Sequence, residues 1–568
     1  MSSPIPVLIV TTFFLQAFVD FDHILQVGAG PSGLVSALVL AHNSIQVRIV
    51  DKTDRYHVGS RGFGPRTLEL FKTLGIVDDI LKASTPIPTM RAYKLPGGTI
   101  PVKTWDLYEK SQVWADRPFA NGVCLSQETL EEILRDNLRK YGISVELHKG
   151  LVAISQNRNI IVATLAVHSH GEPTEATEVV TAHYCIGADG ARGATRKLLG
   201  LTFEGQTRDA DGMVWGDIEI NGLGSNFWHI WGKPGQFTIM ARPLTSSGNR
   251  FSVGITGQNF DPTNLAAPEK AIEFIKTETG RNDLTFGSFS WFSYFKPNMR
   301  MVNKLQEGHV FVAGDSAHVH SPTGGQGMNC SVQDASNLAW KLALVLKNIA
   351  PFSFLSSYNE ERIPVIAQMI FATSQLYTHT VADKSGWLRW RNTALEMYGI
   401  NYRFSSIVLD ERDDSAPDNQ KALAHAYSGY EGSGTLNAGD RAPEAPGILR
   451  EGQVTSLMSL FQHHLHTVLI FSNDYKEVQA VANVVREISI IPNQAFIITK
   501  NSEHRLDNEE MSVLHDSEGH AHAAYLVNEP KDFVVVIIRP DSFIGGIVKE
   551  PEGVSRYFHN ICSIGNRD

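Results

Sequence analysis

Cysteine is scarce in this chain of 568 residues, which contains four. No two of them form a C-x-x-C pair, so the sequence offers neither a zinc ribbon nor a dithiol redox site. Few cysteines in a long chain are typical of a reducing compartment, and we therefore expect a cytoplasmic location. The histidines His318 and His320, and the run HHLH at 463–466, have no further ligand close in sequence. We interpret them as structural and expect no metal.

Long runs of positive charge are also missing. The formal net charge is −10, and the absence of an extended Lys/Arg segment argues against a nucleic-acid partner. The apolar stretch at 5–19 is shorter than the roughly 20 residues of a membrane span, and no Lys or Arg precedes it. We expect no stable membrane span, with an N-terminal signal or anchor as the alternative.

Glycine, by contrast, is concentrated where chemistry is expected. The segment GAGPSG at 28–33 matches a G-x-G-x-x-G fingerprint within a strand–turn–helix–strand pattern. Gly28 would allow the tight turn, Gly30 the close approach of a pyrophosphate, and Gly33 the packing of helix on strand. Asp51 ends the second strand, where a carboxylate can accept a hydrogen bond from a ribose hydroxyl. This order predicts a dinucleotide-binding α/β unit.

Two later motifs also place an acidic residue at a strand end. The segment GADGARGATR at 187–196 reaches Asp189, although a surface loop with two solvated arginines explains it equally well. The segment GDSAHVHSPTGGQGMN at 314–329 contains Asp315, whose carboxylate could accept from a polyol or ribityl hydroxyl. Its three glycines precede a helical run at 334–348, and their amide groups could stabilise negative charge on a ligand.

The order of these motifs, together with SQETLEEIL at 126–134 and QDASNLAWKLA at 333–343, resembles the single-component class A flavoprotein aromatic hydroxylases over about residues 24–365. The similarity is strongest to the phenol 2-monooxygenase-like branch. The tail segments AGDRAPEAP and VVVIIRPDSFIGG resemble the thioredoxin-like C-terminal domain of that branch. In the family this domain lacks C-x-x-C and serves in subunit contacts, so the resemblance implies a homodimer.

The resemblance implies an α/β fold: a Rossmann-type FAD-binding domain with an inserted sheet-rich substrate domain, similar to p-hydroxybenzoate hydroxylase, and a thioredoxin-like C-terminal domain. We expect the FAD-binding domain at 1–200 and 296–385, and the inserted sheet domain at 201–295. A helical segment and linker would follow at 386–434, and the thioredoxin-like domain at 435–568.

The resemblance also implies a set of FAD contacts. Asp51 would bind the adenosine ribose, Gln127 and Asp315 the ribityl region, and Asp189 is associated with both FAD and NADPH in the family. The complete set of expected contacts is Gly28, Ala29, Gly30, Gly33, Asp51, Lys52, Arg61, Gln127, Asp189, Asp315, Pro322, Gly325, Gly327, Met328 and Asn329.

The implied activity is an NAD(P)H-consuming hydroxylation. NADPH would reduce FAD, O₂ would add at C4a to give a flavin hydroperoxide, and a small aromatic substrate, usually a phenol, would take the distal oxygen. The single G-x-G-x-x-G agrees with a family in which NADPH binds without its own Rossmann domain. A flavin epoxidase or reductase on the same scaffold, or a non-catalytic chain with a spoiled FAD site, is the alternative.

One departure from the family pattern affects the chemistry. Arg61 stands where phenol hydroxylases proper have an aspartate that helps to deprotonate the phenol, and arginine cannot act as a base at neutral pH. The catalytic residues are therefore unknown, and a different base, an already acidic substrate or a polyketide-like phenol is expected. The inserted sheet offers candidate pocket residues for which core packing is an equal explanation: Trp215, His229, Trp231, Phe237 and Arg242.

The start of the chain is unusual because two strand-like runs precede the glycines, PVLIV at 6–10 and HILQV at 23–27. The first strand of a doubly wound sheet is buried on both faces, which favours the wholly apolar PVLIV over a run that contains Gln26. Deleting 10–26 joins PVLI to VGAGPSG in frame, and valine and glutamine codons can supply the GT and AG ends of a spliceosomal intron. We predict that 10–26 is a retained or mis-annotated intron, which sequencing of the mature transcript would test. A genuine extension with HILQV as the strand is the alternative.

Overall fold

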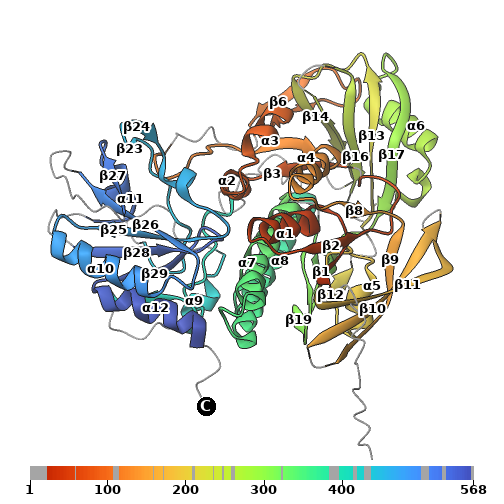
Figure 1. Ribbon diagram of the computed structural model, residues 1–568. Helices are drawn as coiled ribbons and strands as arrows, with labels where there is room; N and C mark the ends of the chain where they lie inside the picture. Colours follow the sequence, from red (N-terminus) through yellow and green to blue (C-terminus); the bar gives the residue numbers. More distant parts are fainter. Residues whose placement is uncertain are drawn as a thin grey trace, which may run out of the picture.

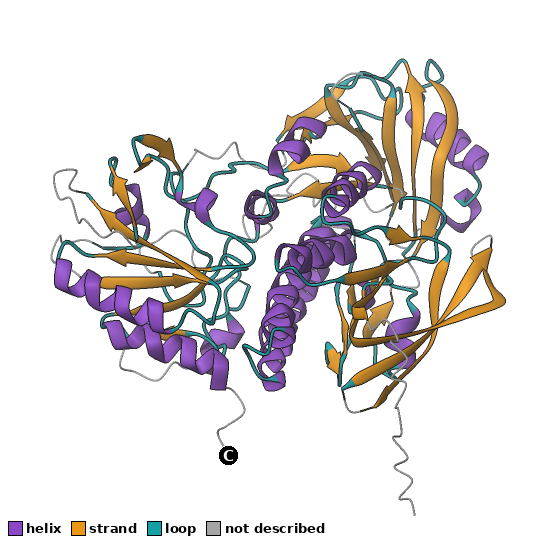
Figure 2. Cartoon of the chain, viewed as in Figure 1, coloured by secondary structure: helices purple, strands orange, loops and turns teal. Residues whose placement is uncertain are grey.

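The computed structural model is shown in Figures 1 and 2. It describes residues 22–57, 59–106, 114–157, 159–169, 172–207, 211–233, 236–245, 248–257, 262–321, 324–382, 396–412, 419–427, 436–500, 511–527 and 533–563. The run PVLIV and most of the predicted insertion at 10–26 lie outside these residues.

An eight-stranded sheet carries the glycine fingerprint. Its order is β19-β20-β11-β1-β2-β8, with β10 and β9 joined to β11 as an antiparallel extension, whereas β20, β11, β1, β2 and β8 run parallel. The strands are β1 (Asp22–Val27), β2 (Val47–Val50), β8 (Val145–Glu146), β9 (Lys149–Asn157), β10 (Ile160–Ser169), β11 (Glu172–Gly187), β19 (Gln306–Glu307) and β20 (Val310–Val312). The parallel core and its open strand ends are those of a Rossmann-type sheet.

The first strand is formed by DHILQV, not by the PVLIV run that the sequence analysis favoured. β1 lies between β11 and β2, and its Ile24 pairs with Tyr184 on one side and Val47 on the other. Gln26 is fully buried, but its amide donates to the Ile186 carbonyl at 3.1 Å and accepts from the Ser36 hydroxyl at 2.9 Å. Because both polar ends are satisfied, glutamine is tolerated in a strand that is buried on both faces. The intron hypothesis stays a prediction.

Helices cover the sheet and connect its strands. α1 (Pro31–His42) packs against both α4 (Gln127–Arg139) and α7 (Gln326–Leu346). The Ser126 hydroxyl caps α4 by accepting from the Thr129 amide at 3.1 Å. Two short helices follow β3, α2 (Pro65–Thr73) and α3 (Val77–Ala83), and they are separated because Gly75 takes a left-handed φ of 72°.

A seven-stranded sheet forms the inserted unit, in the order β17-β13-β16-β15-β14-β5-β6. Its strands are β5 (Thr89–Tyr93), β6 (Pro101–Trp105), β13 (Met213–Asn221), β14 (Phe227–Lys233), β15 (Phe237–Pro243), β16 (Arg250–Thr256) and β17 (Thr285–Phe295), and α6 (Pro268–Thr279) packs on it. β5 pairs in parallel with β14, so the sheet takes two strands from outside 201–295. Two separate segments of the chain, β5–β6 and β13–β17, therefore build this sheet.

Short elements bridge these two units. They are β3 (Ser60–Phe63), β4 (Thr85–Pro86) and β7 (Val123–Ser126) in one small sheet, β12 (Glu204–Thr207), β18 (Asn298–Met301) and β21 (His318–Val319) in another, with α5 (Ala194–Leu198) and the 3₁₀ turn η2 (Gly314–Ser316). Arg61 lies in β3 and Asp315 in η2, and the loop that bears Asp189 leads into α5.

The C-terminal part is a mixed eight-stranded sheet with the order β22-β29-β28-β25-β26-β27-β23-β24. Its elements are β22 (Leu409–Asp410), α9 (Asn419–Ala424), β23 (Ile448–Arg450), β24 (Gln453–Thr455), β25 (His466–Phe471), α10 (Tyr475–Glu487), β26 (Asn493–Thr499), β27 (Ser512–Asp516), α11 (His520–Ala524), β28 (Val534–Ile538), β29 (Ile544–Val548) and α12 (Pro551–Ser563). α7 and α8 (Ser356–Ala382) lie between this sheet and the FAD-type sheet (Figures 1 and 2).

A buried ionic network fastens the C-terminal part to these helices. Arg539 donates to both oxygens of Glu361 at 2.7 and 2.9 Å, and Lys341 reaches the same carboxylate at 2.7 Å. All three side chains have no solvent exposure. Among the described residues, no helix is long and apolar enough to cross a membrane.

Candidate functional site

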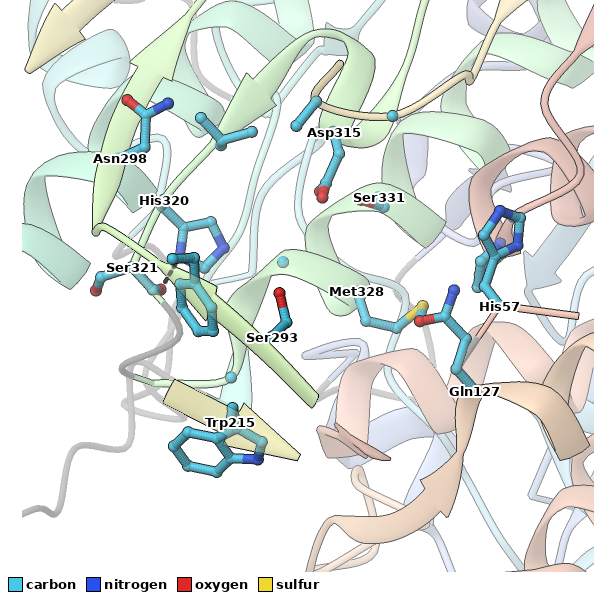
Figure 3. Close-up of a pocket in the computed structure, with 18 of the residues that line it drawn as sticks. His57, Gln127, Trp215, Ser293, Asn298, Asp315, His320, Ser321, Met328 and Ser331 are labelled. Carbon is cyan, nitrogen blue, oxygen red and sulfur yellow. Dashed lines mark hydrogen bonds between the residues drawn. The ribbon is translucent and has the colours of Figure 1, made fainter. Parts of the chain in front are cut away.

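A cavity of about 1220 Å³ runs from the parallel strand ends of the FAD-type sheet to the inner face of the inserted sheet. Its walls come from the loops after β1, β2 and β11, the start of α4, the strands β13 to β17, and the loop that leads into α7. Figure 3 shows side chains of both units pointing into it. The cavity therefore joins the predicted cofactor groove to the predicted substrate domain.

The glycine loop forms one end of the cavity. Gly28 has φ 103°, and a Cβ there would lie 2.3 Å from the Ala188 carbonyl oxygen; a Cβ on Gly33 would lie 2.1 Å from the Gly28 carbonyl oxygen. Gly30 caps α1 and lines the cavity, and a Cβ added to it would meet no other atom within 4 Å. Bare backbone and the positive end of the α1 dipole therefore face a space that suits a diphosphate.

Asp51 shapes this loop and also lines the cavity. Its carboxylate accepts from the Ala29 amide at 2.7 Å and from the Thr53 amide and hydroxyl at 2.9 and 2.7 Å. Burial alone would raise the Asp51 pKa, but these hydrogen bonds outweigh it and lower the pKa below its usual value. Ala29 and Gly33 are buried behind the loop and do not line the cavity, whereas the exposed Lys52 does.

A buried carboxylate that the sequence analysis missed stands beside Gln127. Glu131 has no solvent exposure; it accepts from the Gln127 amide at 2.9 Å and lies 3.0 Å from His57 Nδ1. Gln127 and His57 both line the cavity. The spacing of Gln127 and Glu131, four residues apart on one helix face, was a signal for their contact, but nothing in the sequence linked His57 to them.

Asp189 holds two loops together at the second acidic motif. Its carboxylate accepts from the Thr195 amide and hydroxyl at 2.9 Å each and from the Ser316 hydroxyl at 2.9 Å. Arg196 is buried and donates to the Ser316 carbonyl at 2.7 Å, so it is not a solvated surface arginine. Asp189 and Arg192 also line the cavity.

Asp315 is the clearest ligand-facing group of the third motif. Its side chain is exposed into the cavity (Figure 3), and no hydrogen bond from the described residues reaches its carboxylate. α7 begins at Gln326, eight residues before the predicted helix, so Gly327 and Met328 supply first-turn amides at the cavity wall. Gly325, in a left-handed conformation with φ 64°, caps that helix. The dipole of a 21-residue helix is thus directed at the cavity.

Asn329 clamps the loop after β3 to the start of α7. Its amide nitrogen donates to the Gly62 and Gly325 carbonyls at 3.1 and 2.7 Å, and its oxygen accepts from the Gly64 amide at 2.9 Å. Arg61 lies in β3 opposite Leu125, and its side chain is outside the described part of the structure. Pro322 is also outside it.

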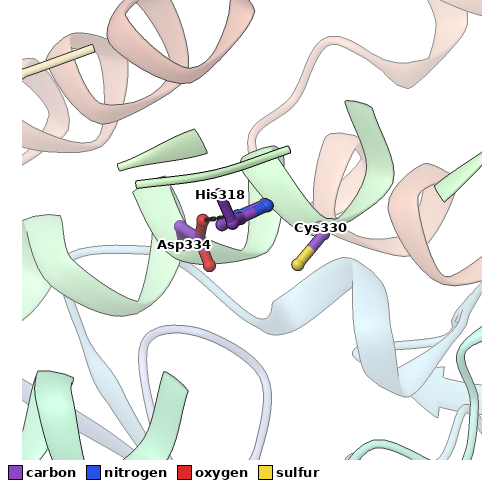
Figure 4. Close-up of side chains that lie close together, drawn as sticks. All are labelled: His318, Cys330 and Asp334. Atoms are coloured by element: carbon purple, nitrogen blue, oxygen red, sulfur yellow. Dashed lines mark hydrogen bonds and ion pairs between the residues drawn. The ribbon is translucent and has the colours of Figure 1, made fainter. Parts of the chain in front are cut away.

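A buried cluster of side chains is hydrogen-bonded to the segment that bears Asp315 (Figure 4). His318, Cys330 and Asp334 place their side-chain ligand atoms within 4.8 Å of one another. Asp334 accepts from His318 Nε2 at 2.8 Å, from Arg362 at 2.7 Å and from the Gly314 amide at 3.1 Å. Burial opposes charge on His318, but Cys330 and Asp334 outweigh it and raise its pKa to about 10. Ion pairing with the Arg362 guanidinium makes this cluster a hydrogen-bonded anchor that fixes the position of Asp315.

The far end of the cavity is an aromatic and methionine-lined chamber. Its lining includes Phe63, Met90, Met213, Trp215, Trp228, Phe237, Met240, Trp291, Phe295 and Tyr377. Trp215 donates to the Ser252 hydroxyl at 2.7 Å and Trp291 to the Asp217 carboxylate at 2.6 Å, so both indoles are fixed in orientation. Rings held in this way give this end of the cavity an apolar wall that suits a flat ligand.

The other candidate pocket residues divide into two groups. Phe237 and Arg242 line the cavity with Trp215, whereas His229 and Trp231 do not. The rings of His229, Tyr93 and Trp231 form a mutually stacked cluster, and burial lowers the pKa of His229 to about 4. His320, interpreted from the sequence as structural, stands on the cavity wall; burial lowers its pKa to about 4, so it is neutral at physiological pH.

Comparison with known proteins agrees with this geometry. The family model described as "FAD binding domain" matches residues 23–373, more than half of the chain. The chain belongs to this FAD-binding family. This match supports the predicted FAD cofactor and the predicted class A flavoprotein family.

Relatives and a solved structure cover most of the chain. A flavin-dependent monooxygenase of Mycobacteroides abscessus is 34% identical over 430 residues, 74% of this chain and 82% of that protein. Pentachlorophenol 4-monooxygenase of Sphingobium chlorophenolicum is 26% identical over 92% of this chain and 93% of its own. The structure of aklavinone-11 hydroxylase with FAD and aklavinone superimposes with a TM-score of 0.75 at 23% identity, over 95% of this chain and 98% of that one. This last similarity establishes the fold alone.

Proposed function

We propose that the chain is an FAD-dependent, NAD(P)H-consuming monooxygenase that hydroxylates an aromatic substrate of phenolic or polyketide-like type. The observation that carries the proposal is the continuous cavity, in which a groove suited to FAD opens into an aromatic chamber. The relatives named above act, by their names, as monooxygenases, and one of them on a chlorinated phenol. These names support the proposed reaction.

The residues of the groove fit FAD. Gly30 and the α1 N-terminus would hold the diphosphate, and the Asp315 carboxylate would accept from ribityl hydroxyls. Gln127, Gly327, Met328 and Asn329 would lie along the ribityl and ring portion. When bound and reduced by NAD(P)H, FAD would supply activated oxygen as its C4a-hydroperoxide. Everything else in the proposed chemistry is positioning and shielding by this chain.

Two features of the chain would serve that chemistry. First-turn amides of α7 would stabilise negative charge that develops at the nearby edge of the cofactor ring. The fixed indoles of Trp215 and Trp291 would orient a flat substrate and exclude water from the reactive oxygen. An arginine at position 61 cannot serve as the base, so we propose a substrate that ionises readily or needs no base from that position.

The C-terminal sheet is proposed to be thioredoxin-like. The elements β25, α10, β26, β28, β29 and α12 follow the order β-α-β-β-β-α, with β25 parallel to β26 and antiparallel to β28. The chain has no C-x-x-C, so the role proposed for this domain is subunit contact in a homodimer rather than redox exchange. Sedimentation analysis of the purified protein tests this part.

The test of the proposed reaction uses the purified full-length chain. The protein is expected to bind FAD and to oxidise NAD(P)H faster with a phenol or polyketide aromatic from a panel than with a non-aromatic compound of similar size. A colourless protein that takes up no added FAD would contradict the proposal. The product mass identifies the hydroxylated compound.

A further inference from the structure

A chain of polar contacts links two of the expected FAD contacts along one wall of the cavity. Asp51 Oδ2 lies 3.8 Å from His57 Nε2, His57 Nδ1 lies 3.0 Å from Glu131 Oε1, and Gln127 donates to the same Glu131 oxygen at 2.9 Å. Asp51 is expected at the adenosine ribose and Gln127 near the ribityl chain. His57 stands between them on the cavity wall, where the diphosphate of a bound FAD would pass.

The hydrogen bonds of the buried Glu131 carboxylate determine which ring nitrogen of His57 can gain or lose a proton. Glu131 has no solvent exposure and also accepts from the backbone amide of His57 at 3.0 Å, so loop and ring are held together. Both Glu131 oxygens already accept hydrogen bonds, from the Gln127 amide and from the His57 backbone amide, so His57 Nδ1 is the donor of its contact and carries a proton. Nε2 is then the one ring nitrogen whose protonation can change, and the ring, about one third exposed, presents it toward Asp51 and the cavity.

The charged groups around His57 favour the imidazolium. The hydrogen bond to Glu131 raises the His57 pKa, burial opposes this, and Glu131 and Asp51 add further attraction while Arg135 repels. The guanidinium carbon of Arg135 lies 4.4 Å from the centroid of the Tyr56 ring, which holds this repelling charge in place. α1, which faces the same space, has no acidic residue in its first turn. A protonated His57 would therefore add a full positive charge beside the α1 N-terminus.

We propose that His57 is a cation that binds the FAD diphosphate through Nε2–H, held in place by Glu131, so that FAD affinity depends on the protonation of His57. This inference rests on the proposed function, because it assigns a role within the same cofactor groove. Binding of a dianionic diphosphate favours the protonated ring, so affinity is highest below the His57 pKa and falls as pH rises through it. The groove glycines have no side chain that titrates, so their contacts to the diphosphate lack this dependence.

The experiment is titration of the flavin-free full-length protein with FAD, followed by flavin fluorescence, at about pH 6.5 and about pH 9. Wild type is expected to bind about tenfold more weakly at the higher pH, equivalent to one pKa unit of coupling. His57→Gln should bind at both pH values about as weakly as wild type does at high pH. His57→Lys, which keeps a cation at both pH values, should restore tight binding without the pH dependence.

Controls separate this role from a loss of folding. His559→Gln makes the same exchange at an exposed position of α12 and should behave as wild type. Thermal melting of each flavin-free variant should show an unchanged folded state. If His57→Gln keeps wild-type affinity and its pH dependence, the assignment of His57 is wrong while the proposed function stands. A wild-type chain that binds no FAD at either pH would contradict the proposed function, and the inference would fall with it.

Discussion

Gly28 and Gly30, on either side of Ala29, differ in whether the folded protein has room for a methyl group. We therefore predict opposite effects of the two alanine substitutions. Gly28→Ala would place a Cβ 2.3 Å from the Ala188 carbonyl oxygen and 2.8 Å from the Asp189 amide nitrogen, at a backbone φ of 103°. Both neighbours are backbone atoms at the end of β11 and cannot turn away. Gly30→Ala has an ordinary φ of −71° and no other protein atom within 4 Å.

The magnitudes follow from these contacts. A side chain in the left-handed region costs about 1–2 kcal/mol, and overpacking a rigid core adds about 1–3 kcal/mol, so Gly28→Ala should lower the free energy of unfolding by about 4 kcal/mol. Gly30→Ala should lower it by less than about 1 kcal/mol, the difference between these residues at a helix N-cap. Its methyl group instead occupies the space of the diphosphate, which should weaken FAD binding at least about tenfold, or about 1.4 kcal/mol.

The assay pairs urea denaturation of the flavin-free protein with FAD titration by fluorescence. We expect Gly28→Ala to lower the free energy of unfolding measured in urea. We expect Gly30→Ala to lower only the FAD affinity measured by fluorescence. Wild-type FAD affinity in Gly30→Ala would refute the reasoning, because it would mean that the α1 N-terminus does not hold the diphosphate. Equal destabilisation by both variants would refute the steric account of Gly28.

Further predictions concern the cofactor groove and the buried charges. Asp315→Ala should leave the melting temperature of the flavin-free protein unchanged, since no described residue bonds its carboxylate, but should weaken FAD binding by about 2 kcal/mol in the same titration. Arg539→Met should lower the free energy of unfolding by about 3–5 kcal/mol in urea, because Glu361 keeps its burial and loses its main partner; adding Glu361→Gln should restore part of the loss. Burial lowers the pKa of His42 to about 4 and of His463 and His466 to about 3, so these rings stay neutral when folded and protonate when unfolded. Their contribution to stability is complete above about pH 6.5 and is lost as pH falls from there toward about 4, so melting temperature should drop between about pH 7.5 and about pH 5, and a flat profile would contradict this.

Local sequence patterns predicted many of the residues that line the cavity. The glycine fingerprint and the acidic residues that follow apolar runs, Asp51, Asp189 and Asp315, are patterns within short stretches of the sequence. Such patterns can be recognised without knowledge of the tertiary contacts. The cavity accordingly gathers most of the expected FAD contacts, while Ala29 and Gly33 support the loop from behind.

Contacts between distant segments explain what the sequence could not reveal. His57 meets Glu131 across 74 residues, and β5 joins the inserted sheet by pairing with β14, which lies far along the chain. The early start of α7 depends on Asn329, whose amide ties Gly62 and Gly325 together. Gln26 looked unsuited to a buried strand because its partners, Ile186 and Ser36, lie on other elements. Tertiary hydrogen bonds of this kind override local propensity.

We propose that this chain transfers one oxygen atom from O₂ to an aromatic ring with the help of bound FAD. The most direct measurement is turnover of an accepted aromatic compound with NAD(P)H under isotopically labelled O₂, followed by mass spectrometry of the product. We expect one labelled oxygen in each hydroxylated product and none from labelled water. Product that carries oxygen from water, or NAD(P)H oxidation that yields only hydrogen peroxide with every aromatic compound of the panel, would contradict it.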